Sequence, residues 1–209
     1  DFIEMFIDEA KIAGHLNHAN IVPIYELGKI GESHYIAMEY IWGKDLLQIM
    51  NRFRRMRKRM PAAMVAFIAG RMCEALEYAH GKRDRSGQPL NLIHRDISPE
   101  NILLSYTGDV KVTDFGIAKV SDSRRATQAG IVKGKLAYMS PEQANQQPLD
   151  PRTDLFSLGI VLYELLSNDD FYPGNTTQEL FAEIAQYREP PKEKFAQLKP
   201  ETQEVLVKA

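Results

Sequence analysis

The stretch HRDISPEN, residues 94–101, decides the fold of this chain. Two triplets follow it, Asp114-Phe115-Gly116 and Ser140-Pro141-Glu142. Asp and Asn also form ordinary turns, so each motif is weak evidence when taken alone. Asn101 lies five positions after Asp96, and Asp114 lies thirteen positions after Asn101. This fixed order and spacing argue against a chance collection of turn residues and indicate a single chemical site.

Hydrophobic periodicity supplies the elements around these motifs. The thirteen residues after Asn101 suffice for a hairpin, with a turn at Thr107-Gly108. The expected strands are Ile21–Leu27, His34–Tyr40, Leu92–Ile93, Ile102–Leu104 and Val110–Thr113, with Gly28 and Gly31 separating the first two. The expected helices are 2–16, 45–59, 61–80, 153–166, 176–186 and 201–208. Residues 82–90 and about twenty-five residues before Glu142 are expected to be loops, and loops of that length are usually functional.

The composition is that of one soluble globular domain. The chain has 209 residues, of which 44% are hydrophobic and 26% charged, and its formal charge is −2. Because the net charge is small, we expect no nucleic-acid binding. We also expect no membrane segment, because the longest apolar run, Leu155–Leu166, is too short to span a bilayer. The single cysteine, Cys73, is expected to pack in a helix rather than to react. The chain begins at Asp1 inside a helical pattern, so we expect a fragment of a longer chain rather than a native terminus.

The three motifs resemble the H-R-D…N, D-F-G and A-P-E set of protein kinases. The Pro-Glu-Asn loop, Ile117-Ala118-Lys119 and the segment Tyr138–Glu142 resemble bacterial serine/threonine kinases in particular, since tyrosine kinases usually differ at this loop. The resemblance covers essentially the whole chain. It implies an α+β, two-lobed fold and one partial kinase domain over 1–209, with a small-lobe remnant at 1–40, a hinge at 41–43 and a mostly helical large lobe at 44–209.

The resemblance also implies an activity: transfer of the γ-phosphoryl group of ATP, with Mg²⁺, to Ser/Thr hydroxyls of protein substrates in signalling. The kinase domain is expected in the cytoplasm, a location that is compatible with a membrane anchor outside this fragment. Asp96 matches the base that accepts or orients the acceptor proton. Asn101 and Asp114 match the magnesium ligands. His94, Phe115, Gly116, Glu142 and Asp154 match structural positions. Asp154 resembles the acid that holds the catalytic-loop backbone, although a favourable charge at a helix N-terminus would also explain it.

Further positions match the nucleotide site of the family. Met38 takes the gatekeeper position, and Glu39 and Ile41 match hinge residues whose backbone meets adenine. Asp45 matches a ribose-contacting acid, with helix N-capping as an equal explanation. Leu103 resembles the apolar residue beneath adenine. The alternative is that it is an ordinary strand leucine, which needs no such role. Glu9, an acid within an apolar helical stripe, matches the partner of a strand lysine, because an unpaired buried carboxylate is costly.

The chain departs from the family pattern in three ways. It lacks the Gly-rich loop and the strand lysine, so this fragment alone is expected to be inactive or nearly so. It ends before the arginine that normally pairs with the acid at Glu142. Ser98 stands where a lysine is usual and Lys135 stands where Thr or Ser is usual, which suggests a reciprocal exchange. The exchange predicts Lys135 Nζ within about 4 Å of Asp96, the ion-pair limit, whereas the alternative is an exposed Lys135 and a tolerated loss at Ser98.

Regulation is expected in the segment between Gly116 and Ser140. Arg95 could pair with a phosphate there, with Thr127 as the first candidate and Ser121 and Ser123 next, and self-association would permit autophosphorylation. An ordinary polar loop is the alternative. Two other function classes remain: a pseudokinase or scaffold, and a small-molecule phosphotransferase of kinase-like fold. A basic run at residues 52–59 fits either a solvated helix face or an anionic docking patch.

Overall fold

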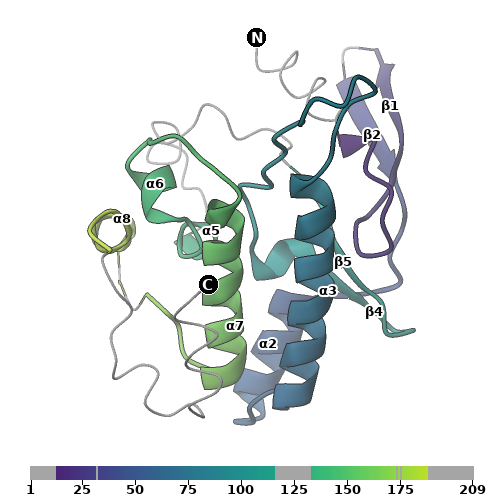
Figure 1. The fold of residues 1–209 in the computed structure, drawn as a ribbon. Coiled ribbons are helices and arrows are strands. Elements are labelled where there is room, and N and C mark those ends of the chain that lie inside the picture. Colours follow the sequence, from purple (N-terminus) through teal and green to yellow (C-terminus); the bar gives the residue numbers. More distant parts are fainter. Residues whose placement is uncertain (1–12, 32, 116–132, 173, 175, 188–209) are drawn as a thin grey trace.

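The computed structural model describes residues 13–31, 33–115, 133–172, 174 and 176–187 (Figure 1). The strands are β1 (Ile24–Ile30), β2 (Ser33–Met38), β3 (Gly43–Asp45), β4 (Ile102–Ser105) and β5 (Val110–Val112). The helices are α2 (Leu46–Arg55), α3 (Ala62–His80), the 3-10 helix η1 (Pro99–Asn101), α5 (Lys133–Leu136), α6 (Pro141–Ala144), α7 (Arg152–Ser167) and α8 (Thr177–Ala185). The chain is thus α+β, as expected.

Helices α3 and α7 form the centre of the molecule and run side by side in opposite directions (Figure 1). Helix α7 is buried on most of its sides, which is why its sequence is apolar almost all round. Helix α3 buries one face through Ile68, Met72 and Leu76, which belong to the same core cluster as Val161 of α7. The antiparallel pairing brings the end of α3, at His80, to the start of α7.

Two small sheets border this helical core. Strands β1 and β2 form an antiparallel hairpin, and β3-β4-β5 form a second antiparallel sheet. A side chain at Gly43 would clash with the backbone carbonyl of Leu104, so only glycine lets β3 approach β4 this closely. Residues before the hairpin are tied to β5, because Asn20 Nδ2 donates to the Val110 carbonyl at 2.7 Å. This bond holds the start of the hairpin region against the β3-β4-β5 sheet.

Most of the expected elements are present, with corrections. Leu92–Ile93 is not a strand, and Gly28 lies inside β1, so the hairpin turn is at Gly31. The expected loop before Glu142 contains α5 and the first residues of α6. Cys73 is exposed, which makes the expected packing role wrong. Most of the expected helix 2–16, the helix 201–208 and the calls at Glu9, Gly116, Ser121, Ser123 and Thr127 lie outside the described residues.

The lobe boundaries at residues 41 and 44 stay predictions. Within the described parts of the chain, no helix is long and apolar enough to cross a membrane.

Candidate active site

The carboxylate of Asp154 is the anchor of the site. It is fully buried in the first turn of α7. Its two oxygens accept hydrogen bonds from the backbone N–H groups of His94 and Arg95, both at 2.8 Å. His80 Nε2 lies 2.7 Å from Asp154 Oδ2. A buried carboxylate is tolerated only when it is paired in this way, so the sequence-predicted role of holding the catalytic loop has a structural basis beyond a helix N-terminal charge.

This anchoring supports a strained backbone at Arg95. Its φ of 65° lies in the left-handed region, which costs energy for a residue with a side chain. Such strain persists only where the surroundings enforce it. The bond from the Arg95 N–H to Asp154, together with the bond from Gln143 Nε2 to the Arg95 carbonyl at 2.9 Å, fixes both sides of this residue.

His94 connects the catalytic loop to the strand that precedes Asp114. Its Nδ1 accepts the Asp96 N–H at 3.2 Å, so its Nε2 carries the proton and donates to the Thr113 carbonyl at 2.8 Å. The ring is fully buried, and burial lowers the pKa of His94. It packs against the Phe115 ring with centroids 4.6 Å apart. A neutral His94 therefore fixes the spacing between Asp96 and Asp114.

Asp96 lies at the centre of a set of polar side chains. Asn101 Nδ2 donates to the Asp96 carbonyl at 2.8 Å and to its Oδ2 at 2.9 Å. Lys135 Nζ donates to the same Oδ2 at 3.2 Å, within the distance expected from the sequence. Both partners are partly buried, with 31% of the Lys135 side chain exposed, so Lys135 is not extended into solvent.

Ser98 behaves differently from its proposed counterpart Lys135. It is fully buried, and its Oγ has no hydrogen-bond partner among the described residues. The ammonium of the expected exchange is therefore beside Asp96, whereas the hydroxyl of Ser98 is not bonded to Asp96 in this structure.

Asn101 and Asp114 present the oxygen atoms expected for magnesium. Asn101 uses its amide nitrogen for Asp96, which leaves its amide oxygen as a ligand, and its carbonyl accepts the Thr113 N–H at 3.0 Å. Asp114 is exposed and has a φ of 60°, again in the left-handed region. Two oxygen ligands completed by phosphates and water are typical of Mg²⁺. No cluster of three acidic, His or Cys side chains suited to a metal occurs within the described ranges.

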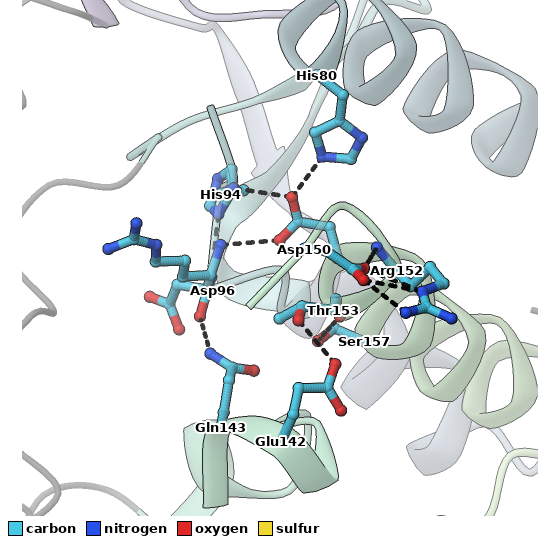
Figure 2. A network of polar contacts seen from close by, with 11 residues as sticks. His80, His94, Asp96, Glu142, Gln143, Asp150, Arg152, Thr153 and Ser157 are labelled. Carbon is cyan, nitrogen blue, oxygen red and sulfur yellow. Dashed lines mark hydrogen bonds and ion pairs between the residues drawn. The ribbon is translucent and has the colours of Figure 1, made fainter. Parts of the chain in front are cut away.

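The segment from α5 to α6 is held against the catalytic loop. Ser140 caps α6 in a reciprocal arrangement with Gln143. Glu142 accepts a hydrogen bond from Thr153 Oγ1 at 2.7 Å, at the start of α7 (Figure 2). Sequence analysis missed Gln143 and His80, since neither belongs to the three motifs. Gln143 three positions after Ser140 fits a capping box, which was an available signal, whereas no local pattern pairs His80 with Asp154.

A buried tyrosine fixes the same segment from behind. The Tyr138 O–H donates to Glu164 Oε2 at 2.8 Å, and Glu164 Oε1 accepts the Phe171 N–H at 3.1 Å. Burial raises the pKa of both Tyr138 and Glu164 above their ordinary values. Arg54 of the basic run reaches Glu164 at 3.7 Å and Asp170 at 2.7 Å, so one member of that run has an internal role that the sequence did not reveal.

The predicted nucleotide residues lie along β2, β3 and β4. Met38 lines a small cavity together with Leu16, Asp114 and Phe115, but Ile41 and Leu103 do not line it. The Glu39 N–H donates to the Pro23 carbonyl, and its carboxylate pairs with Lys111 Nζ at 2.8 Å.

Asp45 caps α2. Its Oδ1 accepts the Gln48 N–H at 2.7 Å, and Gln48 Nε2 contacts its other oxygen. Leu103 pairs with Asp45 and Lys111 in the register of the sheet. The N-capping explanation for Asp45 thus has direct support, while a ribose contact stays a prediction.

The comparison with protein families agrees with this geometry. A family model described as "Protein kinase domain" matches residues 2–208. The chain belongs to this family. Tyrosine-protein kinase MasK of Myxococcus xanthus is 43% identical over 210 residues, which cover 100% of this chain and 32% of MasK. Serine/threonine-protein kinase PknA of Mycobacterium tuberculosis is 35% identical over 211 residues, 99% of this chain and 46% of PknA.

A solved kinase domain has the same fold. The crystal structure of the Mycobacterium tuberculosis PknI kinase domain superposes with a TM-score of 0.63 at 27% identity, over 82% of this chain and 59% of that chain. The two-lobed α+β kinase fold expected from the motifs is confirmed. This chain spans less than half the length of MasK and of PknA. The names of these two relatives differ in the acceptor residue.

Proposed function

We propose that this kinase domain transfers the γ-phosphoryl group of ATP to Ser/Thr hydroxyls of protein substrates. The observation that carries the proposal is the convergence of Asn101 and Lys135 on one carboxylate oxygen of Asp96. An aspartate held by an amide and an ammonium, in a chain of the protein kinase family, fits the base of phosphoryl transfer.

Each group at the site has a defined task in this reaction. The Asp96 carboxylate accepts or orients the proton of the acceptor hydroxyl as the new O–P bond forms and the bond to the β-phosphate oxygen breaks, releasing ADP. The Lys135 ammonium places positive charge where negative charge develops on the transferred group. Asp154 and His94 hold the loop so that these side chains need no rearrangement.

ATP and Mg²⁺ fit the residues that are present. Asn101 and Asp114 would hold Mg²⁺ through their side-chain oxygens. When bound, Mg²⁺ neutralises charge on the phosphates. Glu39 and Ile41 would meet adenine through their backbone groups, with Leu103 beneath the ring and Asp45 near the ribose. Arg95, with a buried Nε that has no partner among the described residues, would receive a phosphorylated residue such as Thr127, Ser121 or Ser123.

The acceptor class is tested directly on the full-length protein. Peptides that carry a single Ser, Thr or Tyr are incubated with ATP labelled at the γ-phosphate, and the modified residue is identified by mass spectrometry. We expect label on Ser and Thr, lost in Asp96→Asn and retained in Asp169→Asn, an exposed aspartate outside the site. Transfer to Tyr alone would replace the proposed acceptor with that named for MasK. Absence of transfer to all three peptides and to the protein itself would favour the scaffold alternative.

A further inference from the structure

The solvent-facing side of α3 carries an unusual stripe. Ala63, Phe67, Gly70, Glu74 and Glu77 follow one another at spacings of three and four residues, so they lie on one face of the helix. All five are exposed, and 50% of Phe67 is accessible to solvent. The opposite face of α3 is buried in the core. The stripe therefore has an apolar part, Ala63, Phe67 and Gly70, followed by two glutamates, and the described residues leave it uncovered.

Gly70 has no explanation within the described residues. It lies in the middle of a helix of 19 residues, where glycine is less favourable than alanine. A Cβ added at Gly70 would meet no atom within 4 Å, so the packing of the described chain does not require a glycine. Glycine at such a place is useful when the backbone of another element approaches closely. The residue therefore indicates that something docks at this point of α3.

Opposite charges flank the apolar residues of the stripe along the sequence. Glu74 and Glu77 lie toward the C-terminal end of α3. Arg57 and Lys58, both exposed, precede its N-terminal end in the turn after α2. Phe67 lies about midway along the sequence between these basic and acidic groups. Arg71 pairs with Glu74 at 2.8 Å and places its guanidinium over the Phe67 ring, 5.6 Å from the centroid, which holds the ring in place.

We propose that this α3 face, defined by Ala63, Phe67, Gly70, Glu74 and Glu77, docks against the α3 face of a second copy of this chain. The two helices run antiparallel about a two-fold axis near Phe67 and Gly70. In a two-fold interface the same patch contacts itself, so the patch must be self-complementary. An apolar centre flanked by one basic and one acidic end meets this requirement, whereas a parallel pairing would bring acid against acid.

The size of the α3 face sets the expected strength of the dimer. At 1.5 Å per residue, α3 is about 28 Å long, and a single pair of helices buries less than the roughly 1,200 Å² typical of stable complexes. The dimer is therefore weak and reversible, and it assembles when the local concentration is high. Its formation does not depend on phosphoryl transfer.

Site-directed crosslinking tests the arrangement in the full-length protein. A disulfide needs Cβ atoms about 3.5–4.5 Å apart, which a two-fold axis at residue 67 allows. In a Cys73→Ser background, Phe67→Cys should form a disulfide dimer at least tenfold faster than Tyr106→Cys, a matched control that is 60% exposed on the turn between β4 and β5. Equal rates would overturn the proposal. Protection of the thiol at residue 67 from maleimide in dilute monomer would also overturn it, because another part of the same chain would then cover the face.

Charge reversal tests the antiparallel register by heterodimer formation. Glu77→Lys and Lys58→Glu, each in the Phe67→Cys background, should each slow crosslinking about tenfold, and mixing the two should restore the mixed dimer. Unchanged crosslinking in both variants would contradict the register. The Asp96→Asn background should give the same rates, so this result is separate from the outcome for the proposed activity.

Gly70→Ala separates docking from helix stability. Alanine should raise the melting temperature of dilute protein, since it favours the helix, while it slows crosslinking at residue 67. Faster crosslinking, or no change in it, would show that the backbone at Gly70 does not meet a partner.

Discussion

The catalytic loop (residues 94–101) and the hinge segment (residues 38–45) differ in how their side chains are held. In the catalytic loop, His94, Ser98 and Asn101 are buried, and Asp154 of α7 fixes the backbone from sixty residues away in sequence. In the hinge segment, Tyr40 is 85% exposed and Trp42 is also exposed, and the Asp45 side chain bonds, among the described residues, to Gln48 of the helix that it caps. The long-range side-chain contacts of this segment among the described residues lie nearer the surface: Glu39 pairs with Lys111, Met38 Sδ accepts a bond from Thr113 Oγ1, and the Trp42 ring contacts Tyr106.

This difference follows from the chemistry that each segment is expected to perform. Proton transfer and metal binding use side chains, which must be of a fixed type and in a fixed place. Adenine is expected to meet the backbone of Glu39 and Ile41, where many side chains serve equally well. We therefore expect substitutions of the same type to have large effects in the catalytic loop and small effects in the hinge segment.

The largest effect is expected for Asp96→Asn. Asparagine keeps the shape of the side chain but cannot accept the acceptor proton as a carboxylate does, so the turnover rate should fall about 10²- to 10⁴-fold. Asp45→Asn in the hinge segment should change the turnover rate much less, because asparagine is an equally good N-cap. Steady-state assays of the full-length protein measure both.

The melting temperatures provide the control for this pair. Both variants should unfold close to the temperature of the wild type, since Asn101 can still bond to the backbone carbonyl of residue 96. Near-normal turnover in Asp96→Asn would remove Asp96 from its proposed role.

The second prediction concerns Lys135. Removing one preorganised charge from a site of this kind typically costs about 10²- to 10³-fold in rate, so Lys135→Ala should lose turnover in this range. The double variant Ser98→Lys with Lys135→Thr should recover much of it if the two positions are exchanged. Lys44→Ala, which removes an exposed lysine of β3, serves as the control.

The outcome of the double variant also tests Ser98. Ser98 is fully buried. A lysine at this position must therefore reach Asp96 from a buried site. If Lys135→Ala keeps full turnover, the contact with Asp96 has no catalytic role. If the single variant is impaired and the double variant does not recover, the exchange hypothesis fails while Lys135 retains its role.

The features predicted correctly from the sequence depend on residues whose role no other residue type could perform. The kinase fold and family were predicted from three motifs and are confirmed, and the Lys135–Asp96 distance was predicted from two unusual residues. These predictions rested on residues whose chemical role few other residue types can perform.

The parts that were missed depend on packing that a linear pattern does not carry. Cys73 lies within an apolar helix, but α3 has apolar residues on its exposed side too, so periodicity could not assign its face. The contacts of Tyr138 with Glu164 and of Gln143 with Arg95 join residues that no local pattern pairs. The short helix α5 was hidden in a long segment with no clear periodicity.

The third prediction compares two aspartates at helix starts in free energy of unfolding. Asp154→Ala leaves two buried N–H groups and His80 without their acceptor, and breaking a buried charged network costs about 3–5 kcal/mol. Asp45→Ala removes only an N-cap, which is worth about 1 kcal/mol. Urea unfolding measures both values. Hydrogen exchange at the amides of His94 and Arg95 should accelerate in Asp154→Ala alone, and equal effects of the two variants would remove the proposed difference between the regions.

The smallest effect is expected for the long-range ion pair of the hinge segment, Glu39–Lys111. The pair is partly exposed, so its contribution is at most about 1 kcal/mol, equivalent to a change of about two- to fivefold. Lys111→Met frees the Glu39 side chain and should raise the KM for ATP by this factor with kcat unchanged, because the hinge backbone is then held less firmly before ATP binds. Lys111→Arg should restore the KM, and Lys44→Met should leave it unchanged. A fall in kcat with no change in KM would place Lys111 outside nucleotide binding, and the hinge would then depend on its backbone contacts alone.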